Sequence, residues 1–325
     1  MQTKKEYREE FLQKYGTEIQ NANMDKIAYL IEKAVKTNKP QILDYKNIVS
    51  IGAAKKGEKV DANQLAFLLE NIFEYWIKNN IKIRLKTAQS DWQKQEYEKL
   101  IEDFDFYKKN KKEFDIFDFW SYYGEKWIDG KKSPIYFQGK HFCHFYTNML
   151  STDRFDFEKQ WYDAKIYLNI KVQNTPKLAK IFIDKAIQKN IPLTFKFGFG
   201  DDRNDNFVLY SEYKHINSLI DMIEETKKEN PKLFVGCKVK NPLMSTLKGY
   251  MGFGEEPVTW GSYNSVRVDI LEGTYRTLAK LYKNDKGCLT KDNIISAFND
   301  ECKRNYVDSQ KFYLNQKEQY LNYDK

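Results

Sequence analysis

Basic and phenolic side chains stand in three short, strand-like segments of the sequence. The segment "AKIYLNI" carries Lys165 and Tyr167, "IPLTFKFGF" carries Lys196, and "NFVLY" ends at Tyr210. Because successive side chains of a strand point to opposite faces, Lys165 and Tyr167 share one face of the first segment. If the three strands are neighbours, these lysines and tyrosines converge beside Arg203, in a set that could handle a charged group. The alternative is a solvent-facing sheet surface that is rich in lysine.

Three other motifs do not fit the chemistry that they suggest. The acidic run "DDRNDN" starts like a calcium-binding loop at Asp202, but Phe207 stands where that loop needs glycine and Tyr213 where it needs glutamate. The "GFG" at 198–200 lacks the lysine and the following helix of a phosphate-binding loop. Two adjacent glutamates before a proline, in "GEEP" at 254–257, are typical of a turn. These motifs therefore predict neither a calcium site nor a nucleotide site.

The cysteines and histidines indicate no metal site. The cysteines lie scattered, without a CxxC pair, and no histidine has the spacing of a metal ligand. The residues are Cys143, Cys237, Cys288 and Cys302, and His141, His144 and His215. The first residues, "MQTKKEYREEFLQKYG", have no apolar core of a signal peptide, and no apolar run is long enough to span a bilayer. We therefore expect a soluble, cytoplasmic protein with reduced thiols and no membrane partner.

The composition is that of a folded protein with a mild basic excess. Of 325 residues, 41% are apolar and 16% aromatic, which suffices for a core in one large domain or two smaller ones. The 54 basic and 46 acidic side chains leave a formal charge of +8. This charge suits an anionic partner without demonstrating one, and we predict no nucleic-acid partner.

The periodicity of apolar residues divides the chain into two parts. Residues 1–112 read as mostly helical, and Asp61 is the expected N-cap of one strongly apolar helix. Beyond them, an aromatic stretch with Gly and Pro is followed by alternating strands and helices, including a helix with Thr175 as its N-cap and a possible strand in "KLFVGCKV". We predict an α+β fold with a helical N-terminal half, 1–112, and a mixed sheet-plus-helices C-terminal half, 113–325.

Five sequence pieces in a fixed order resemble the HopA-type effector family. They are "KIYLNI", "IPLTFKF", "RNDNFVLY", "GYMGFGEEP" and "GSYNSVR", within residues 163 to about 281. The last piece departs from the family pattern "SFGxxR" at its third position, Asn264, and still delivers Arg267. The family includes plant-pathogen effectors and bacterial proteins similar to the lyases of class V lanthipeptide pathways. Both resemble the phosphothreonine lyases more distantly.

This resemblance implies roles for individual residues of a HopA-like lyase domain. Lys196 takes the place of the catalytic base, and Tyr167 stands where the phosphothreonine lyases have their histidine acid. The remaining roles are phosphate binding by Lys165, Arg203 and Arg267, and substrate binding by Tyr210 and Asn169.

The implied reaction removes phosphate from phosphoserine or phosphothreonine and leaves a dehydroamino acid. Lysine is a base only when neutral, and its ordinary pKa of about 10.4 is lowered by burial and nearby cations. Arginines that supply this positive field would also bind the leaving phosphate through bidentate hydrogen bonds. Such chemistry requires no metal, nucleotide or redox cofactor.

The implied partners are a phosphorylated ribosomal precursor peptide and a separate Ser/Thr kinase, since this chain has no kinase signature. The N-terminal helices or the aromatic residues 113–146 are candidates for the peptide groove. The alternative is a non-catalytic HopA-type effector, or another protein that only binds phosphopeptides.

Overall fold

The computed structural model describes residues 2–49, 60–111, 127–128, 131–132, 135–138, 142–146, 162–198, 206–259 and 261–317. Helices dominate the described N-terminal part and alternate with strands beyond it. The α-helices are α1 (Lys4–Tyr15), α2 (Met24–Thr37), α3 (Tyr45–Val49), α4 (Ala62–Trp76), α5 (Lys82–Lys86), α6 (Asp91–Asn110), α8 (Thr175–Lys189), α9 (Tyr213–Glu229), α10 (Tyr263–Asn284) and α11 (Lys291–Arg304). The predicted α+β class is confirmed.

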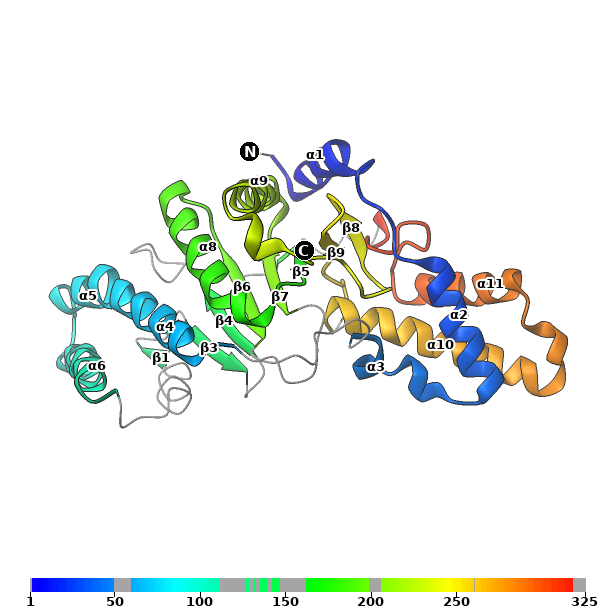
Figure 1. The fold of residues 1–325 in the computed structure, drawn as a ribbon, viewed down its shortest axis with the longest axis horizontal. Helices are drawn as coiled ribbons and strands as arrows, with labels where there is room; N and C mark the ends of the chain where they lie inside the picture. Colours follow the sequence, from blue (N-terminus) through cyan, green and yellow to red (C-terminus); the bar gives the residue numbers. More distant parts are fainter. Residues whose placement is uncertain are drawn as a thin grey trace.

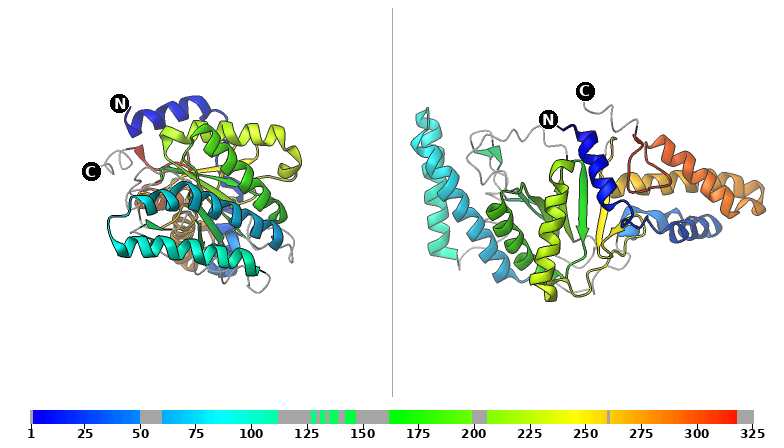
Figure 2. Two further views of the ribbon diagram at one scale, coloured as in Figure 1. Left: turned by 90° about the vertical axis from the view of Figure 1, so that its left-hand side faces the viewer. Right: turned by 90° about the horizontal axis from the view of Figure 1, so that it is seen from above.

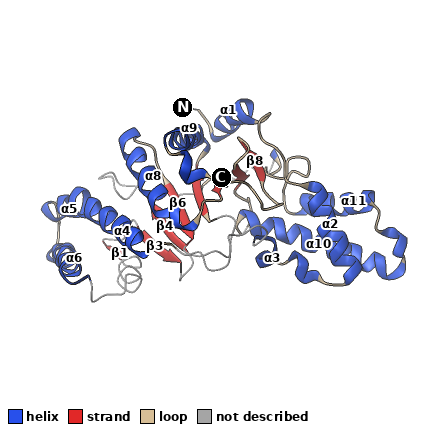
Figure 3. Ribbon diagram, viewed as in Figure 1, coloured by secondary structure: helices blue, strands red, loops and turns tan. Residues whose placement is uncertain are grey.

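An antiparallel sheet of seven described strands lies at the centre of the molecule (Figures 1 and 3). Its strands are β3 (Ile135–Gln138), β4 (Phe142–Tyr146), β5 (Ala164–Leu168), β6 (Thr194–Gly198), β7 (Phe207–Ser211), β8 (Ser245–Leu247) and β9 (Met251–Glu255). Their order is β3-β4-β6-β7-β5-β9-β8, and β1 (Trp127–Ile128) pairs separately with β2 (Lys131–Lys132). Strands β6, β7 and β5 are therefore neighbours, as the convergence of their lysines and tyrosines requires.

The sheet has two chemically different faces. Helices α8 and α9 cover one face of the sheet (Figure 2). Phe195, Phe207 and Ile166 point to that face and belong to the main hydrophobic core. Phe182 of α8, for example, sets its ring 5.6 Å from that of Phe207. Tyr167, which alternates with Ile166, points to the opposite face and belongs to a separate small cluster. The alternation of strand residues thus separates core from candidate site.

Local sequence signals account for several helix boundaries. Asp61 caps α4 as predicted, because its side chain accepts hydrogen bonds from two backbone N–H groups of the first turn. Thr175 is instead the first residue of α8, and its hydroxyl donates to the carbonyl of Val172. The strand expected in "KLFVGCKV" is wrong. That segment begins with a 3₁₀ turn at Pro231–Phe234 and turns at Gly236, whose φ of 81° favours glycine.

The N-terminal helices do not pack as one separate unit. Helix α1 packs on α9, helices α2 and α3 pack on α10, and α4 packs on α8. Figure 1 shows the consequence: α4, α5 and α6 lie beyond one edge of the sheet, while α2, α10 and α11 lie beyond the other. The domain boundary near residue 112 stays a prediction.

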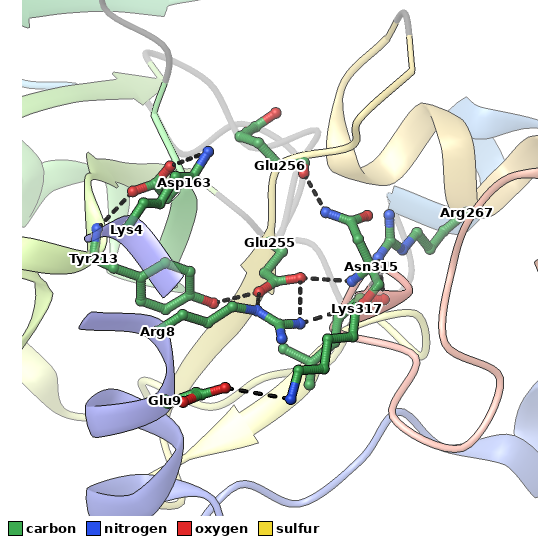
Figure 4. Close-up of polar contacts among 11 residues, drawn as sticks. Lys4, Arg8, Glu9, Asp163, Tyr213, Glu255, Glu256, Arg267, Asn315 and Lys317 are labelled. Atoms are coloured by element: carbon green, nitrogen blue, oxygen red, sulfur yellow. Dashed lines mark hydrogen bonds and ion pairs between the residues drawn. The ribbon is translucent and has the colours of Figure 1, made fainter. Parts of the chain in front are cut away.

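A buried ion pair fastens α1 to strand β9 (Figure 4). Arg8 holds the carboxylate of Glu255 through its Nε and, at 3.1 Å, through its Nη2. The same carboxylate accepts hydrogen bonds from the Tyr213 hydroxyl and the Asn315 backbone N–H, each at 2.6 Å. The cluster therefore joins the N-terminal helix, the sheet, helix α9 and the segment after α11. The turn expected at "GEEP" is wrong for Gly254 and Glu255, which end strand β9.

A glycine in β9 leaves room for a buried ring, and its replacement is expected to destabilise the fold. A Cβ on Gly254 would lie 2.2 Å from the ring of Tyr263, which is fully buried and donates its hydroxyl proton to the Leu243 carbonyl. Overpacking of this kind costs about 1–3 kcal/mol. We expect Gly254→Ala to lower the free energy of unfolding by that amount, measured by urea denaturation.

Gly252→Ala in the same strand is the matched control. Its Cβ would meet the flexible end of Met244 at 3.0 Å and the Tyr167 Cβ at 3.1 Å, so a smaller loss is expected. A greater loss for Gly252→Ala than for Gly254→Ala would contradict the role of the Tyr263 ring.

Candidate functional site

The strand register brings most of the described candidate residues onto one face of the sheet. Across β4, β6, β7 and β5, one row consists of His144, Lys196, Val208 and Tyr167. The next row contains Thr194, Tyr210 and Lys165 on β6, β7 and β5. Directly opposite residues of antiparallel strands, and residues two apart, share a face. We call this the site face, defined by His144, Lys165, Tyr167, Lys196 and Tyr210.

Lys196 stands in the middle of strand β6 and is partly exposed, although the residues beside it in the strand are buried. It lies opposite His144 on one side and Val208 on the other. The predicted base therefore projects from the middle of a strand and is partly exposed on the site face. The neighbouring histidine was not predicted from the sequence, because the histidines were considered only as possible metal ligands.

Lys165 is almost fully buried and has a carboxylate partner. Its Nζ forms an ion pair with Glu256, just beyond β9, and lies 5.0 Å from the centre of the Tyr210 ring. The Tyr210 ring in turn packs against Tyr162, at a centroid distance of 5.3 Å. Tyr162 donates its hydroxyl proton to Thr194 at 2.8 Å. Lys165 and Tyr210 thus meet as predicted, together with a glutamate that sequence reasoning assigned to a turn.

Tyr167 is 5% exposed and sits in an apolar cluster with Val208, Met244 and Tyr263. Its ring centre lies 6.1 Å from that of Tyr263. Tyr263 begins helix α10, where burial raises the pKa of its hydroxyl to about 12. The two phenols therefore join β5 to the start of α10. The role of Tyr167 as an acid stays a prediction.

Arg267 lies on α10 and is fully buried, unlike an open phosphate ligand. Its Nε and Nη2 each donate to the Phe312 carbonyl at 3.2 Å, and its guanidinium lies 4.2 Å from the centre of the Tyr263 ring. Its Nη1 is buried without a hydrogen-bond partner among the described residues. Burial lowers the pKa of this arginine. Because Arg267 is fully buried, a phosphate would reach its guanidinium only after the side chains that cover it move. Phosphate binding by Arg267 stays a prediction.

The two remaining candidates are placed differently. Asn169 follows β5 directly, and its side-chain amide donates to the Lys238 carbonyl at 3.3 Å. Arg203 lies within 199–205, outside the described residues. The roles of both in substrate or phosphate binding stay predictions.

The described cysteines and acidic residues suggest no metal centre. No group of three or more His, Cys, Asp or Glu side chains in the described parts of the chain could hold a metal ion. Cys143, Cys237 and Cys302 are buried free thiols, and burial raises the pKa of Cys237 to about 11 and that of Cys302 to about 12. Among the helices described, none has the length and apolar character needed to cross a membrane.

An apolar cavity of about 350 Å³ lies between α4 and α8. Phe67, Leu68 and Pro176 line it together with Asn63, Gln64, Lys177 and Lys180, and Phe67 is 58% exposed. Helix α8 covers the core face of the sheet, so this cavity and the site face lie on different sides of it. The N-terminal helices therefore offer a concave surface, and its use as a peptide groove stays a prediction.

The comparisons with known proteins show similarity of fold alone. No protein-family model matches the chain, and no curated protein matches it. Among solved structures, it is similar to an effector protein from Pseudomonas syringae pv. tomato strain DC3000, with 10% identity and a TM-score of 0.50. It is also similar to one from Pseudomonas syringae pv. syringae strain 61, with 11% identity and a TM-score of 0.51.

Both alignments cover 90% of this chain and 97% of the other. The chain thus shares, over most of its length, the fold of these effector proteins. This likeness agrees with the resemblance to effector proteins at the level of the fold, and at such low identity it carries no residue's role.

Proposed function

We propose that this chain is a cytoplasmic phosphoserine/phosphothreonine lyase that acts on a ribosomal precursor peptide in lanthipeptide biosynthesis. A separate Ser/Thr kinase supplies the phosphorylated peptide. The observation that carries the proposal is the strand register, which sets Lys196, Tyr167, Lys165 and Tyr210 together on the site face. A base, a proton donor and a phosphate-binding cation are the groups that such an elimination needs.

In the proposed reaction, the neutral amine of Lys196 removes the Cα proton of the phosphorylated residue. The electron pair of the Cα–H bond forms the Cα=Cβ double bond, and the Cβ–O bond breaks. The phosphate leaves with the electrons of that bond, and a proton donor, by resemblance Tyr167, protonates its bridging oxygen. Fixed positive groups act mainly on the transition state, where negative charge builds on that oxygen.

The proposed phosphate site centres on Lys165. Its amine already binds one anionic group, the carboxylate of Glu256. A phosphate carries more charge and more acceptor oxygens than a carboxylate, so it is able to compete for the same amine. Arg203 and Arg267 complete the proposed site, the latter after movement of the groups that bury it.

Mass spectrometry tests the proposed function directly. We expect the chain, without added cofactor, to convert members of a synthetic library of phosphoserine and phosphothreonine peptides to products that have lost one phosphoric acid per site. The same peptides without phosphate must stay unchanged. Absence of elimination from every phosphopeptide would count against a lyase.

A non-catalytic phosphopeptide-binding protein is the second candidate. Lys165 already binds one anionic group, the carboxylate of Glu256, and binding alone requires neither a base nor a proton donor. Phosphate-dependent binding without elimination, on the same peptide library, would identify this function.

Glu256→Gln is expected to strengthen phosphopeptide binding. The change removes the negative charge that competes with phosphate for Lys165 and keeps the shape of the side chain. Charge-assisted hydrogen bonds contribute about 1.5–3 kcal/mol, and the lower end of this range corresponds to an expected gain of roughly tenfold in affinity. Isothermal titration calorimetry with a phosphopeptide and its unphosphorylated form measures the gain.

Glu225→Gln is the control, because Glu225 pairs with Lys185 and Lys189 on the outer surface of α8 and α9. It should leave phosphopeptide affinity unchanged. Weaker binding by Glu256→Gln would mean that Glu256 positions Lys165 and does not compete with the ligand.

A further inference from the structure

A histidine on strand β4 faces the proposed base. His144 and Lys196 are directly opposite each other in the pairing of β4 with β6, and both side chains are partly exposed on the site face. The Cβ atoms of directly opposite residues in an antiparallel pair lie about 4.5–5.5 Å apart. The ends of these two side chains are therefore able to reach one bound group together.

The other proton donors of the site face, Tyr167 and Tyr210, occupy strand positions that are farther from Lys196 than the position of His144. Tyr167 lies two strands away across β7, a backbone separation of about 10 Å at 4.7–4.9 Å per strand. Tyr210 is diagonal to Lys196 on β7, which corresponds to about 7–8 Å between positions. Because the base and the acid of an elimination act on neighbouring atoms of one residue, the donor next to the base is best placed.

The chemistry of the neighbours also favours histidine. A phenol ordinarily loses its proton near pH 10, whereas an imidazole exchanges its proton closest to neutral pH. Lys165, which is also on the site face, forms an ion pair with Glu256. Two adjacent basic groups disfavour simultaneous protonation, so the pair of His144 and Lys196 favours a state that holds one proton. Such a pair contains one base and one acid.

We propose that His144 is a further catalytic residue, the general acid that acts together with Lys196. This inference rests on the proposed lyase function, and it assigns to His144 the proton transfer that the resemblance gives to Tyr167. Lys196 takes the Cα proton, the C–H electrons form the double bond, and the Cβ–O bond breaks toward the phosphate. An N–H of the His144 imidazolium gives its proton to the bridging oxygen. The new ammonium of Lys196 then returns a proton to the neutral imidazole, which restores the pair.

The decisive variant is His144→Gln, assayed on a phosphoserine peptide that the parent protein converts. We expect the elimination rate to fall by roughly 10²–10⁴-fold, the usual contribution of a general acid. The rate of the parent should rise with pH as the pair loses its first proton and fall again as it loses its second, because only the state that holds one proton contains a base and an acid. The residual rate of His144→Gln should lack the fall at high pH. In His144→Ala, added imidazole should restore part of the rate.

His215→Gln is the matched control, because His215 lies on α9, which covers the core face. Its rate should equal that of the parent. A rate within twofold of the parent for His144→Gln, or an unchanged alkaline limb, overturns the proposal. In that case a large loss in Tyr167→Phe would assign the acid role to Tyr167.

A binding measurement does not depend on the folding of His144→Gln. The chain has three histidines, so their imidazole NMR signals can be assigned with single variants of His141 and His215. In the Lys196→Met protein, saturation with the phosphoserine peptide should shift the His144 signal and leave that of His215 in place. No shift of His144 overturns the inference even when the parent eliminates phosphate. If the parent neither binds nor converts any phosphopeptide, the lyase function itself fails.

Discussion

Replacing Lys196 with methionine is expected to abolish phosphate elimination and to leave phosphopeptide binding nearly intact. Methionine has about the length of the lysine stem and lacks the amine, so only the proton acceptor is removed. Lys196 is the partly exposed residue of an otherwise buried strand, so its replacement should leave no cavity in the core. Loss of a general base lowers rates by roughly 10²–10⁴-fold, and single-turnover mass spectrometry of the phosphopeptide measures the loss.

Two controls separate this effect from unfolding or a general change of charge. Lys214→Met removes a lysine from α9, where it pairs with Glu212, and should eliminate phosphate at the parent rate. Circular dichroism should give the same melting temperature for Lys196→Met and the parent. Full elimination by Lys196→Met would remove this lysine as the base, and loss of phosphopeptide binding would assign it to the phosphate site.

The pattern of apolar residues within single segments was sufficient to predict the strands that carry Lys165, Lys196 and Tyr210, which is one part of the site face. The segments around Lys165, Lys196 and Tyr210 are strands. Apolar residues alternate with the lysines in the first two, and the third is continuously apolar up to Tyr210. Hydrophobic periodicity is a local property, so these elements could be found without knowledge of their neighbours. The same signal was ambiguous in "KLFVGCKV", where a proline and a left-handed glycine turn the chain despite apolar composition.

Pairings between distant segments could not be predicted from local patterns. His144 meets Lys196 only because β4 inserts beside β6, although more than one element separates them along the chain. Glu256 meets Lys165 because β9 pairs with the edge of β5 that β7 does not occupy. Strand β9 was not predicted, because it contains glycines, which are uncommon in strands and typical of turns. Register across a sheet depends on the whole fold, which is why the structure adds these two residues to the site.

The burial of Arg267 has a similar origin. The family resemblance placed an arginine at the start of a helix, and α10 does carry it in its first turns. The carbonyl of Phe312 that it binds belongs to a segment 45 residues later, after α11. The sequence had no sign of this partner, so an accessible phosphate ligand and a buried structural arginine could not be distinguished.

Arg8→Met is expected to destabilise the fold more than any exposed ion-pair variant. Glu255 is fully buried, and Arg8 is its charged partner in the cluster of Figure 4. Removal of one partner leaves a buried charge without compensation, which costs about 3–5 kcal/mol. The tyrosine and backbone donors that remain, Tyr213 and Asn315, supply hydrogen bonds and no positive charge. Urea denaturation followed by circular dichroism measures the loss.

An exposed pair in the same region is the natural comparison. Lys317 and Glu9 also connect α1 to the C-terminal segment, at 3.3 Å, but their side chains are 62% and 49% exposed. Solvent screens such a pair, so Lys317→Met should change the free energy of unfolding by less than about 1 kcal/mol. Similar losses for Arg8→Met and Lys317→Met would contradict a special contribution of burial.

The double variant Arg8→Met/Glu255→Gln tests whether the cost comes from the orphaned charge. With the carboxylate replaced by a neutral amide, no charge is left buried, although only one of the two donors keeps an oxygen acceptor, because the Tyr213 hydroxyl and the Asn315 N–H bind different oxygens of Glu255. The double variant should therefore be more stable than Arg8→Met alone, as expected for residues in direct contact, whose effects are not additive. If the second substitution lowers stability further, the two side chains contribute through packing and hydrogen bonds. The attachment of α1 to β9 would then depend on shape and not on the balance of charge.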